Sequence, residues 1–405
     1  MIKINTILSI FFISGILFFG RAFTPIFEAL PGELASRIFT PISLIFYILS
    51  FYLIVREGEQ YKHIIHSALY PLLICVVALL SSLLSFNITS SLPKSIALTG
   101  GLVFAIAFVI TQKKDDALDT FLLAIFWALL ISFFVSLLMP SIGIDDGSND
   151  PDHLGLWQGI FGFKNNLGRT CAFFLLILYF KTVHGNNYKW YVWLLPIILL
   201  IMSKSTTPSI ALISSIGAFQ FFRLSKRMSI SAKIMFIPIL SFLILLAVKS
   251  VEFIIVEIFN KDLSGSGRSE MWQVILKNID YSLFGYGFGG VFWGEGNPAE
   301  YIIGRFYYHL GHAHNGFIDA LIDMGLIGFI SYFIVLAFPL IHAIRKFSSG
   351  NKIYSISILT LVFLILYSLS GSSFLKQNNL LFIIYSISVF YPNWRSYCER
   401  NNGNR

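Results

Sequence analysis

The chain alternates between long runs of apolar residues and short polar connections. A helix needs roughly 20 mostly apolar residues to cross a bilayer, and about twelve runs approach that length. They lie near residues 5–23, 38–55, 64–86, 92–111, 117–139, 167–180, 190–203, 208–222, 233–249, 324–342, 354–371 and 378–392. The runs are continuously apolar instead of alternating, which favours helices over a membrane β-barrel. The pattern therefore predicts an all-α, polytopic integral membrane protein with about 12 transmembrane helices.

Two of the polar segments are longer than a simple connection. One extends from about 140 to 166, and the other from about 250 to 323, between the ninth and tenth predicted helices. Only the second is long enough to fold as a small lobe, and loops on a rigid scaffold commonly carry function. We therefore expect four parts: N-terminal helices (1–139), central helices with polar motifs (140–249), one large outer loop (250–323), and C-terminal helices with a tail (324–405).

Composition supports a membrane protein and excludes two other classes. Hydrophobic residues make up 56% of the 405 residues and charged residues only 12%, with a mean hydropathy of +0.75. Soluble domains carry about 25% charged residues, so a water-soluble globule is excluded. A disordered chain is also excluded, because disorder requires low hydrophobicity and this chain is highly hydrophobic. The cysteines (Cys75, Cys171 and Cys398) are too few and too scattered for a disulfide framework.

The charge balance orients the predicted helices. The formal net charge is +8, from 29 Lys and Arg against 21 Asp and Glu. In a soluble protein this excess would suggest a nucleic-acid partner, but in a membrane protein it marks cytoplasmic loops. Most basic residues share one side when the N-terminus is placed in the cytoplasm, and an even number of helices returns the basic tail to that side. We expect both termini in the cytoplasm, contact with membrane lipid and no nucleic-acid partner.

The sharpest polar cluster on the outer side is the histidine motif His312-Ala313-His314-Asn315, before the tenth predicted helix. A histidine at the membrane surface can act as a general base near neutral pH. His314 and His312 are therefore candidate catalytic residues. The alternative interpretation is a polar cap on a helix start, and spacing alone does not separate the two.

A second cluster lies in the large outer loop, where Arg268 follows the glycines of the string SGSG and begins a helical pattern. Backbone N–H groups at a helix start, together with a guanidinium, suit phosphate binding. The alternative is a flexible linker followed by a surface helix.

A third cluster is the polar turn SKSTTP between the seventh and eighth predicted helices, which carries Lys204. Its ammonium and the neighbouring hydroxyls could hold an anion. An ordinary outer loop with one snorkelling lysine is the alternative, although a lysine on the outer side departs from the positive-inside trend.

The fourth cluster, GIFGFKNNLGR, leads into the sixth predicted helix and carries Lys164 and Arg169. Its glycines permit a tightly packed backbone, and the two basic residues are expected at the outer interface. Helix-entry packing with interfacial anchors is the alternative interpretation.

These four clusters are basic or bear imidazoles, and all lie on the predicted outer side. The combination favours an anionic substrate presented from the membrane, such as a lipid-linked phosphate or pyrophosphate. The histidine motif lacks a nearby Cys and a regular third ligand, which disfavours zinc. An acidic stretch at Asp145, Asp146, Asp150 and Asp152 does not follow EF-hand spacing and indicates a solvated loop. We expect neither a metal nor a cofactor.

The order of the motifs resembles the superfamily of O-antigen ligases and of O-antigen and exopolysaccharide polymerases. The strings that carry the resemblance are GIFGFKNNLG, SKSTTPSIAL, SGSGRSEMW followed by LFGYGFGG, and HAHNGFIDALIDMGLIG. They span about 157–330, and their order and the position of the long loop are more specific than any one string.

The resemblance implies a glycosyltransferase on the periplasmic face of the bacterial inner membrane. Its donor would be a glycan on undecaprenyl pyrophosphate, and no metal or nucleotide sugar would be used. His314 matches the histidine taken as the general base, and Arg268 matches the loop arginine that binds the pyrophosphate. The second arginine of the superfamily falls on Lys204, which keeps the charge but loses the bidentate fork.

The mechanism implied by this resemblance places the donor pyrophosphate among Arg268, Lys204 and either Lys164 or Arg169. Their charges would stabilise the leaving lipid pyrophosphate. His314 would take the proton of the acceptor hydroxyl, which attacks the anomeric carbon, and His312 would orient His314 or the acceptor.

Three functions are compatible with the motifs. A polymerase would use a lipid-linked repeat as acceptor, with a chain-length regulator as a further partner. A ligase would use lipid A–core. A polysaccharide flippase is the more remote alternative, because transporters place ionisable groups near the bilayer midplane, whereas these motifs cluster at one face. KNNLG and GRSEMW favour the polymerase.

Overall fold

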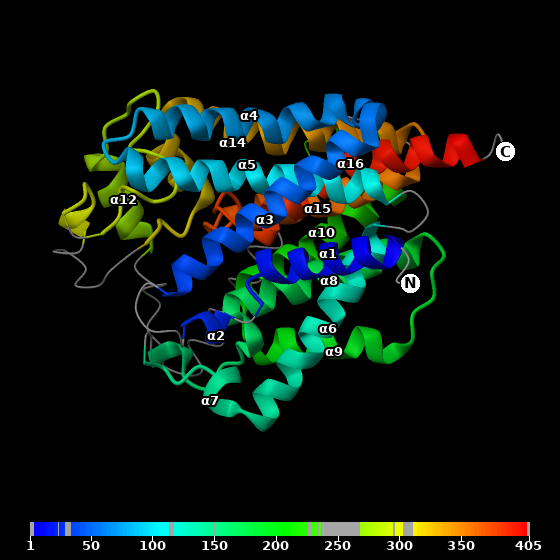
Figure 1. Ribbon diagram of the computed structural model, residues 1–405, viewed down its shortest axis with the longest axis horizontal. Helices are drawn as coiled ribbons and strands as arrows, with labels where there is room; N and C mark the ends of the chain where they lie inside the picture. The colour runs from blue at the N-terminus through cyan, green and yellow to red at the C-terminus, as the bar shows by residue number, and fades with distance from the viewer. Residues whose placement is uncertain are drawn as a thin grey trace. The chain divides into compact units, whose positions relative to one another are not determined.

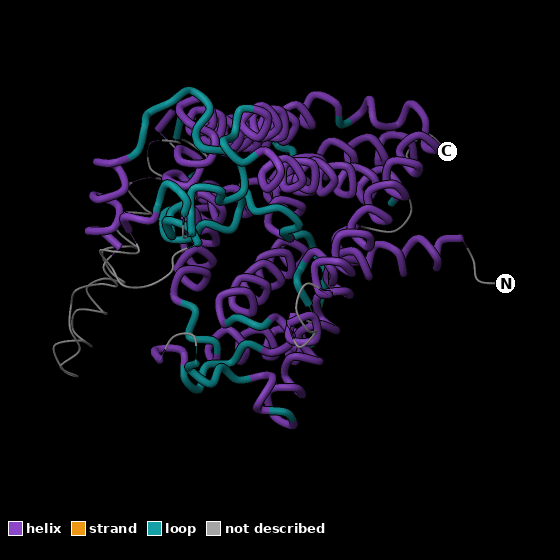
Figure 2. The backbone as a smooth tube through the Cα atoms, turned by 60° about the vertical axis from the view of Figure 1, so that its left-hand side comes forward, coloured by secondary structure: helices purple, strands orange, loops and turns teal. Residues whose placement is uncertain are grey.

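A computed structural model describes residues 4–22, 24–28, 34–112, 117–148, 151–225, 228–229, 231–232, 235, 238, 268–294, 296–302 and 311–402. These parts are built from helices joined by turns and loops (Figures 1 and 2). Within them no strand is formed, and the one isolated β-bridge pairs Ile144 with Trp157. The expected all-α class is confirmed for this part of the chain.

The α-helices occupy most of the predicted apolar runs. Their bounds are α1 (Ile4–Phe19), α2 (Thr24–Glu28), α3 (Leu34–Glu57), α4 (Ile65–Leu83), α5 (Ile88–Thr111), α6 (Ala117–Leu138), α7 (Pro140–Gly143), α8 (Lys164–Val183), α9 (Trp190–Met202), α10 (Thr206–Leu224), α12 (Arg268–Asn278), α14 (Gly316–Ser348), α15 (Ser355–Ser368) and α16 (Leu380–Asn402). Short 3₁₀ turns are η1 (Gly58–His63), η2 (Pro151–His153), η3 (Gly159–Phe161) and η5 (Lys352–Tyr354). The predicted ninth run, 233–249, lies almost entirely outside the described residues.

Six helices in the described part are long and apolar enough to cross a membrane. They are Arg37–His63, Ile65–Leu83, Ile88–Thr111, Ala117–Leu138, Lys164–Val183 and Gly316–Ser348. Three shorter apolar helices accompany them: Thr6–Phe19, Trp190–Met202 and Lys352–Ser368. The molecule is therefore an integral membrane protein, while the total of about 12 spans stays a prediction.

Helix α3 shows why a membrane is needed. Ile48, Phe51 and Val55 are each more than 60% exposed, and they lie three or four residues apart, on one helix face. A row of large exposed apolar side chains is unfavourable in water. Contact with the lipid tails of a membrane removes these side chains from water.

Two compact units are built from segments far apart in sequence. Unit 1 consists of Met1–Ile64, Val103–Ile216 and Asn378–Arg405, and unit 2 of Ile65–Leu102 and Gly217–Gln377. In unit 1, α1 packs on α6 and α8 packs on α9. In unit 2, α14 packs along α4, which lies beside it in Figure 1, and along α15. The four consecutive parts expected from the sequence stay a prediction.

Within unit 2, α12 packs onto the glycine-rich loop, residues 285–294, which follows it in sequence. Met271, Ile275 and Ile279 recur at helical spacing and are buried. They share one apolar core with Phe292, Trp293, Ala299, Ile302, Ala313 and Ile322. This core ties the described part of the large loop to the start of α14.

Helix α14 begins earlier than the sequence pattern predicts. The pattern predicts the tenth apolar run at 324–342, but α14 starts at Gly316 and is kinked at Gly325, where φ is 65° and ψ is −159°. Beyond the kink, Leu326 N–H donates to the Ser282 carbonyl oxygen at 3.0 Å, and Ile327 N–H donates to the Leu283 carbonyl oxygen at 3.1 Å. The loop therefore accepts the N–H groups that the kink releases from the helix.

Candidate functional site

The two motif histidines lie immediately before α14. Asn315 is the N-cap of this helix, and its side-chain oxygen accepts from the N–H groups of Phe317 at 3.0 Å and Ile318 at 3.2 Å. His314 has a positive φ of 54°. The rings of His312 and His314 meet edge to face, with centroids 4.1 Å apart. The start of α14 thus fixes both imidazoles in one short turn, residues 312–315, which is called the histidine turn below.

Two hydrogen bonds from other helices and one within the turn itself hold the histidine turn. The Ala313 N–H donates to Asp319 Oδ1 at 2.8 Å. Trp272 Nε1 donates to the Ala313 carbonyl oxygen at 2.7 Å. The His314 N–H donates to Nδ1 of His312 at 3.2 Å. A ring nitrogen that accepts carries no proton, so a neutral His312 bears its proton on Nε2.

Both imidazoles are neutral at neutral pH. Burial, followed by the positive charge of Lys376 and the neighbouring His314 and Arg268, lowers the pKa of His312 to about 2. Burial, followed by the charges of Arg268 and Lys376, lowers the pKa of His314 to about 4. A neutral imidazole keeps a lone pair that can accept a proton.

Arg268 belongs to the same group of residues in unit 2. It is the first residue of α12, as the sequence pattern predicts, and its Nη1 donates to the Ser370 carbonyl oxygen at 3.4 Å. Asn315 Nδ2 donates to the neighbouring Leu369 carbonyl oxygen at 3.3 Å. Unit 2 therefore brings Arg268 near the histidine turn, although the two are far apart in sequence.

A carboxylate that the sequence analysis missed anchors the glycine-rich loop. The carboxylate of Asp323 accepts from the N–H groups of Gly289 at 3.1 Å and Gly290 at 3.2 Å. Lys94 Nζ donates to the Gly289 carbonyl oxygen at 2.9 Å. Gly289 has a φ of 92°, and a Cβ there would also collide with the Lys94 side chain. Asp323 and Lys94 thus clamp this loop to helices α14 and α5.

The signal for the missed carboxylates was present in the sequence. Asp319 and Asp323 are four residues apart and therefore share one face of α14. Ionisable residues inside an apolar helix are costly and usually functional. Placing the helix start at 324 assigned both residues to the loop and hid this signal. No comparable spacing in the sequence marked Lys376 as a neighbour of these residues.

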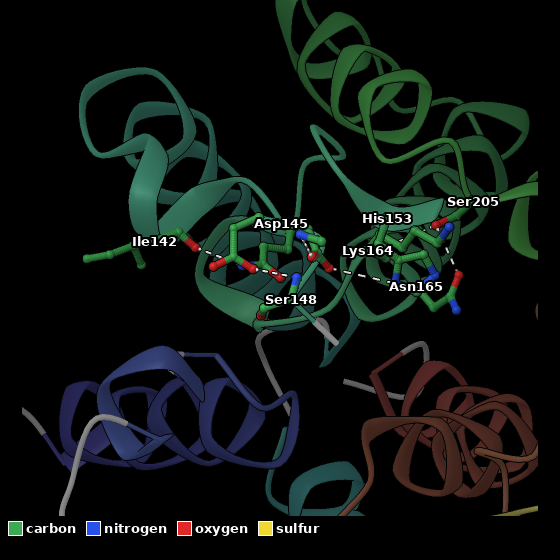
Figure 3. A network of polar contacts seen from close by, with 10 residues as sticks. Ile142, Asp145, Ser148, His153, Lys164, Asn165 and Ser205 are labelled. Carbon is green, nitrogen blue, oxygen red and sulfur yellow. Dashed lines mark hydrogen bonds and ion pairs between the residues drawn. The ribbon is translucent and has the colours of Figure 1, made fainter. Parts of the chain in front are cut away.

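The other basic candidates lie in unit 1, around two adjoining turns. Lys164 begins α8, and Lys204, with a φ of 45°, lies in the turn between α9 and α10. Ser205 Oγ donates to the Lys164 carbonyl oxygen at 2.9 Å and joins these two turns (Figure 3). A Cβ at Gly168 would collide with Ser205, so the close approach depends on glycine.

Arg169 corrects one expectation about this group. The sequence predicts Arg169 at the outer interface, but the residue is only 6% exposed, while Lys204 is exposed and Lys164 is half-buried. Arg169 follows Gly168 into the part of α8 where nearly every residue is buried. A buried guanidinium requires acceptors or an anion to offset its desolvation.

The expected solvated acidic loop is wrong at Asp145. This residue is 8% exposed, and its Oδ1 accepts from the Gly147 N–H at 2.9 Å. Its Oδ2 lies 3.7 Å from Nδ1 of His153 (Figure 3). Asp145 therefore orders the segment instead of facing water. Within the described residues, no group of three or more His, Cys, Asp or Glu side chains is arranged to hold a metal ion.

Helices and motifs together define an integral membrane protein with histidine and basic clusters at helix starts and turns. Residues 190–333 match the family model for O-antigen ligase, which confirms the resemblance to the O-antigen ligase and polymerase superfamily. The matched region includes Lys204, Arg268, His312 and His314. It supports a glycan-transferring activity of the ligase or polymerase type. No curated protein matches the chain.

Proposed function

We propose that the protein is a glycosyltransferase that polymerises oligosaccharide repeats carried on undecaprenyl pyrophosphate. The observation that carries this proposal is the short turn in which His314, held by the start of α14, lies beside Arg268 of α12. A base and a phosphate-binding cation are the two groups that this transfer requires. The family match over 190–333 supports the same class of reaction.

The proposed reaction is a single displacement. His314 accepts the proton of the acceptor hydroxyl, and the hydroxyl oxygen forms a bond to the anomeric carbon of the donor glycan. The bond from that carbon to the pyrophosphate oxygen breaks, and its electron pair leaves with the lipid pyrophosphate. Arg268 stabilises the charge that develops on this leaving group. Attack opposite the leaving group inverts the anomeric carbon.

His312 serves as a positioning residue in this proposal. Its Nδ1 accepts from the His314 N–H, so it helps to fix the unusual backbone conformation of His314. The basic residues of unit 1 are proposed as anion-binding residues on separate evidence. Ser205 joins the turn that carries Lys204 to Lys164, and Arg169 is a buried cation of the helix that Lys164 begins. No metal or other cofactor takes part in the proposed reaction.

The proposed location is the inner membrane, with both termini in the cytoplasm and the histidine turn facing the periplasm. The distribution of basic residues supports this orientation. Lipid-linked donors and growing glycans are the proposed partners, together with membrane lipid and a chain-length regulator.

A ligase is the second candidate, because the matching family model is described as O-antigen ligase. The two activities share the donor and differ in the acceptor, which is a lipid-linked glycan for the polymerase and lipid A–core for the ligase.

Purified full-length protein in detergent, supplied with lipid-linked repeats, tests the proposal. A polymerase converts single repeats to a ladder of longer chains. A ligase leaves them unchanged until lipid A–core is added and then transfers glycan to it. Unchanged glycans with both acceptors would contradict a glycosyltransferase and favour a flippase. His314→Ala serves as the inactive control, and His66→Ala, at an exposed histidine of unit 2, is the matched active control.

A further inference from the structure

The segment 369–377, between α15 and α16, borders the histidine turn from a third direction. The Ser370 carbonyl oxygen accepts from Arg268 Nη1, and the Leu369 carbonyl oxygen accepts from Asn315 Nδ2. This segment lies outside the region that matches the O-antigen ligase family model, which ends at residue 333. It therefore adds residues that the motifs of the sequence did not include.

Lys376 is the charged residue of this segment, whose Leu369 and Ser370 carbonyl oxygens contact Asn315 and Arg268. Its backbone N–H donates to the Ser373 carbonyl oxygen at 3.4 Å, which turns the segment back on itself. Its positive charge acts on both His312 and His314, and also on Asp319. The positive charge of Arg268 acts on the same two imidazoles.

We propose that Lys376 is a second phosphate-binding residue of the histidine site and contacts the donor pyrophosphate together with Arg268. This inference rests on the proposed function, since it names a further contact for the same donor. It assigns to the C-terminal part of the chain a direct role in substrate binding.

Charge and shape both favour a contact between Lys376 and the donor pyrophosphate. Two cations whose charges act on the same turn repel each other, and an anion bound between them would offset that repulsion. Pyrophosphate presents two neighbouring phosphate groups, which suits two separate cationic contacts. An arginine supplies a planar, directional contact and a lysine supplies a compact point charge, so Arg268 and Lys376 would complement each other.

The alternative role for Lys376 is structural, because its charge also acts on Asp319, whose Oδ1 holds the Ala313 N–H. In that case Lys376 would stabilise the turn through Asp319 and would not touch the donor. The two roles differ in a measurable way: only a binding residue changes the affinity for the phosphate groups while the turn stays intact.

The test measures binding of inorganic pyrophosphate to the purified full-length protein by calorimetry, alongside glycan transfer. Lys376→Met should weaken pyrophosphate binding about tenfold, because a charge-assisted contact is lost. Lys376→Arg should bind within a few-fold of the unchanged protein. The matched control is Lys277→Met, which removes an exposed lysine at the end of α12. If Lys376→Met lowers the yield of folded protein, Lys376→Gln takes its place.

Unchanged pyrophosphate affinity in the Lys376 variants would overturn the inference, and so would equal weakening in Lys277→Met. This failure is distinct from failure of the proposed function. If the protein transfers glycan, and His314→Ala abolishes transfer, but the Lys376 variants bind pyrophosphate normally, only the inference about Lys376 is wrong. If no glycan is transferred by any variant, the proposed function is wrong whatever the binding result.

Discussion

Asp319 Oδ1 accepts a hydrogen bond from the backbone N–H of Ala313 at 2.8 Å, so the first turn of α14 holds the turn that precedes it. Ala313 separates the two histidines, and its carbonyl oxygen is held in turn by Trp272. The position of His314 therefore depends on side chains from two helices, α12 and α14, and not on its own sequence neighbours alone.

Asp319→Ala should lower kcat about a hundredfold, since a base displaced by about 1 Å loses roughly that factor. The unpaired Ala313 N–H also costs about 1–3 kcal/mol where it is buried. Transfer assays on purified protein and thermal unfolding in detergent measure the two effects. Asp280→Ala, at an exposed aspartate of unit 2, is the control and should change neither. Full activity in Asp319→Ala would show that the turn keeps its position without this hydrogen bond.

His314→Ala should reduce glycan transfer by about 10²–10⁴-fold, the usual contribution of a general base. The amount of protein in the membrane should stay the same, because the half-buried imidazole has no described role in the apolar core. His312→Ala should retain part of the activity, since it removes only the acceptor for the His314 N–H. Product formed by His314→Ala at the unmodified rate would exclude this histidine as the base.

The rate of transfer should not fall near pH 6.5, where an unperturbed histidine base becomes protonated. The pKa of His314 is lowered to about 4, so this base is unprotonated throughout the range from pH 7 down to about 5 and is lost only as the pH falls through about 4. His312, with a pKa lowered to about 2, stays neutral over the same range. We expect kcat/KM, which reports the free enzyme, to stay level to about pH 5.

Removing a neighbouring positive charge should move the acid limb of the pH profile, where His314 becomes protonated, to higher pH. Arg268→Gln and Lys376→Met each relieve a charge that disfavours the imidazolium of His314. Bound pyrophosphate should act in the same direction, so the acid limb of kcat should lie above that of kcat/KM. Asp319 is the carboxylate in contact with the turn. The pH dependence of transfer by Asp319→Ala should therefore be measured alongside that of the two charge variants. An acid limb of kcat/KM at pH 6.5 in the unmodified protein would contradict the environment described for His314.

Local patterns in the sequence were sufficient for most of the apolar helices, for the start of α12 at Arg268 and for the histidines before α14, but not for the start of α14 itself. They were insufficient where a contact joins distant residues, as between Arg268 and Ser370 or between Lys94 and Gly289. Burial was also beyond the pattern: Arg169 looks like an interfacial anchor in sequence, and only packing around α8 buries it. Sequence alone therefore gave the least reliable environment for charged residues whose surroundings come from distant parts of the chain.

Gly325→Ala should uncouple the glycine-rich loop from α14. The φ of 65° and ψ of −159° belong to a backbone region that is essentially restricted to glycine and costs other residues about 1–3 kcal/mol. A Cβ here would also lie only 2.5 Å from the Gly285 nitrogen, so the loop would have to move. Gly58→Ala is the matched control, because Gly58 has a φ of 60° but nothing lies within 4 Å of its added Cβ. We expect a lower melting temperature in detergent and a loss of transfer for Gly325→Ala, and a smaller loss of stability with full transfer for Gly58→Ala. Equal behaviour of the two variants would mean that backbone strain alone matters and that the contact between the kink and the loop does not support activity.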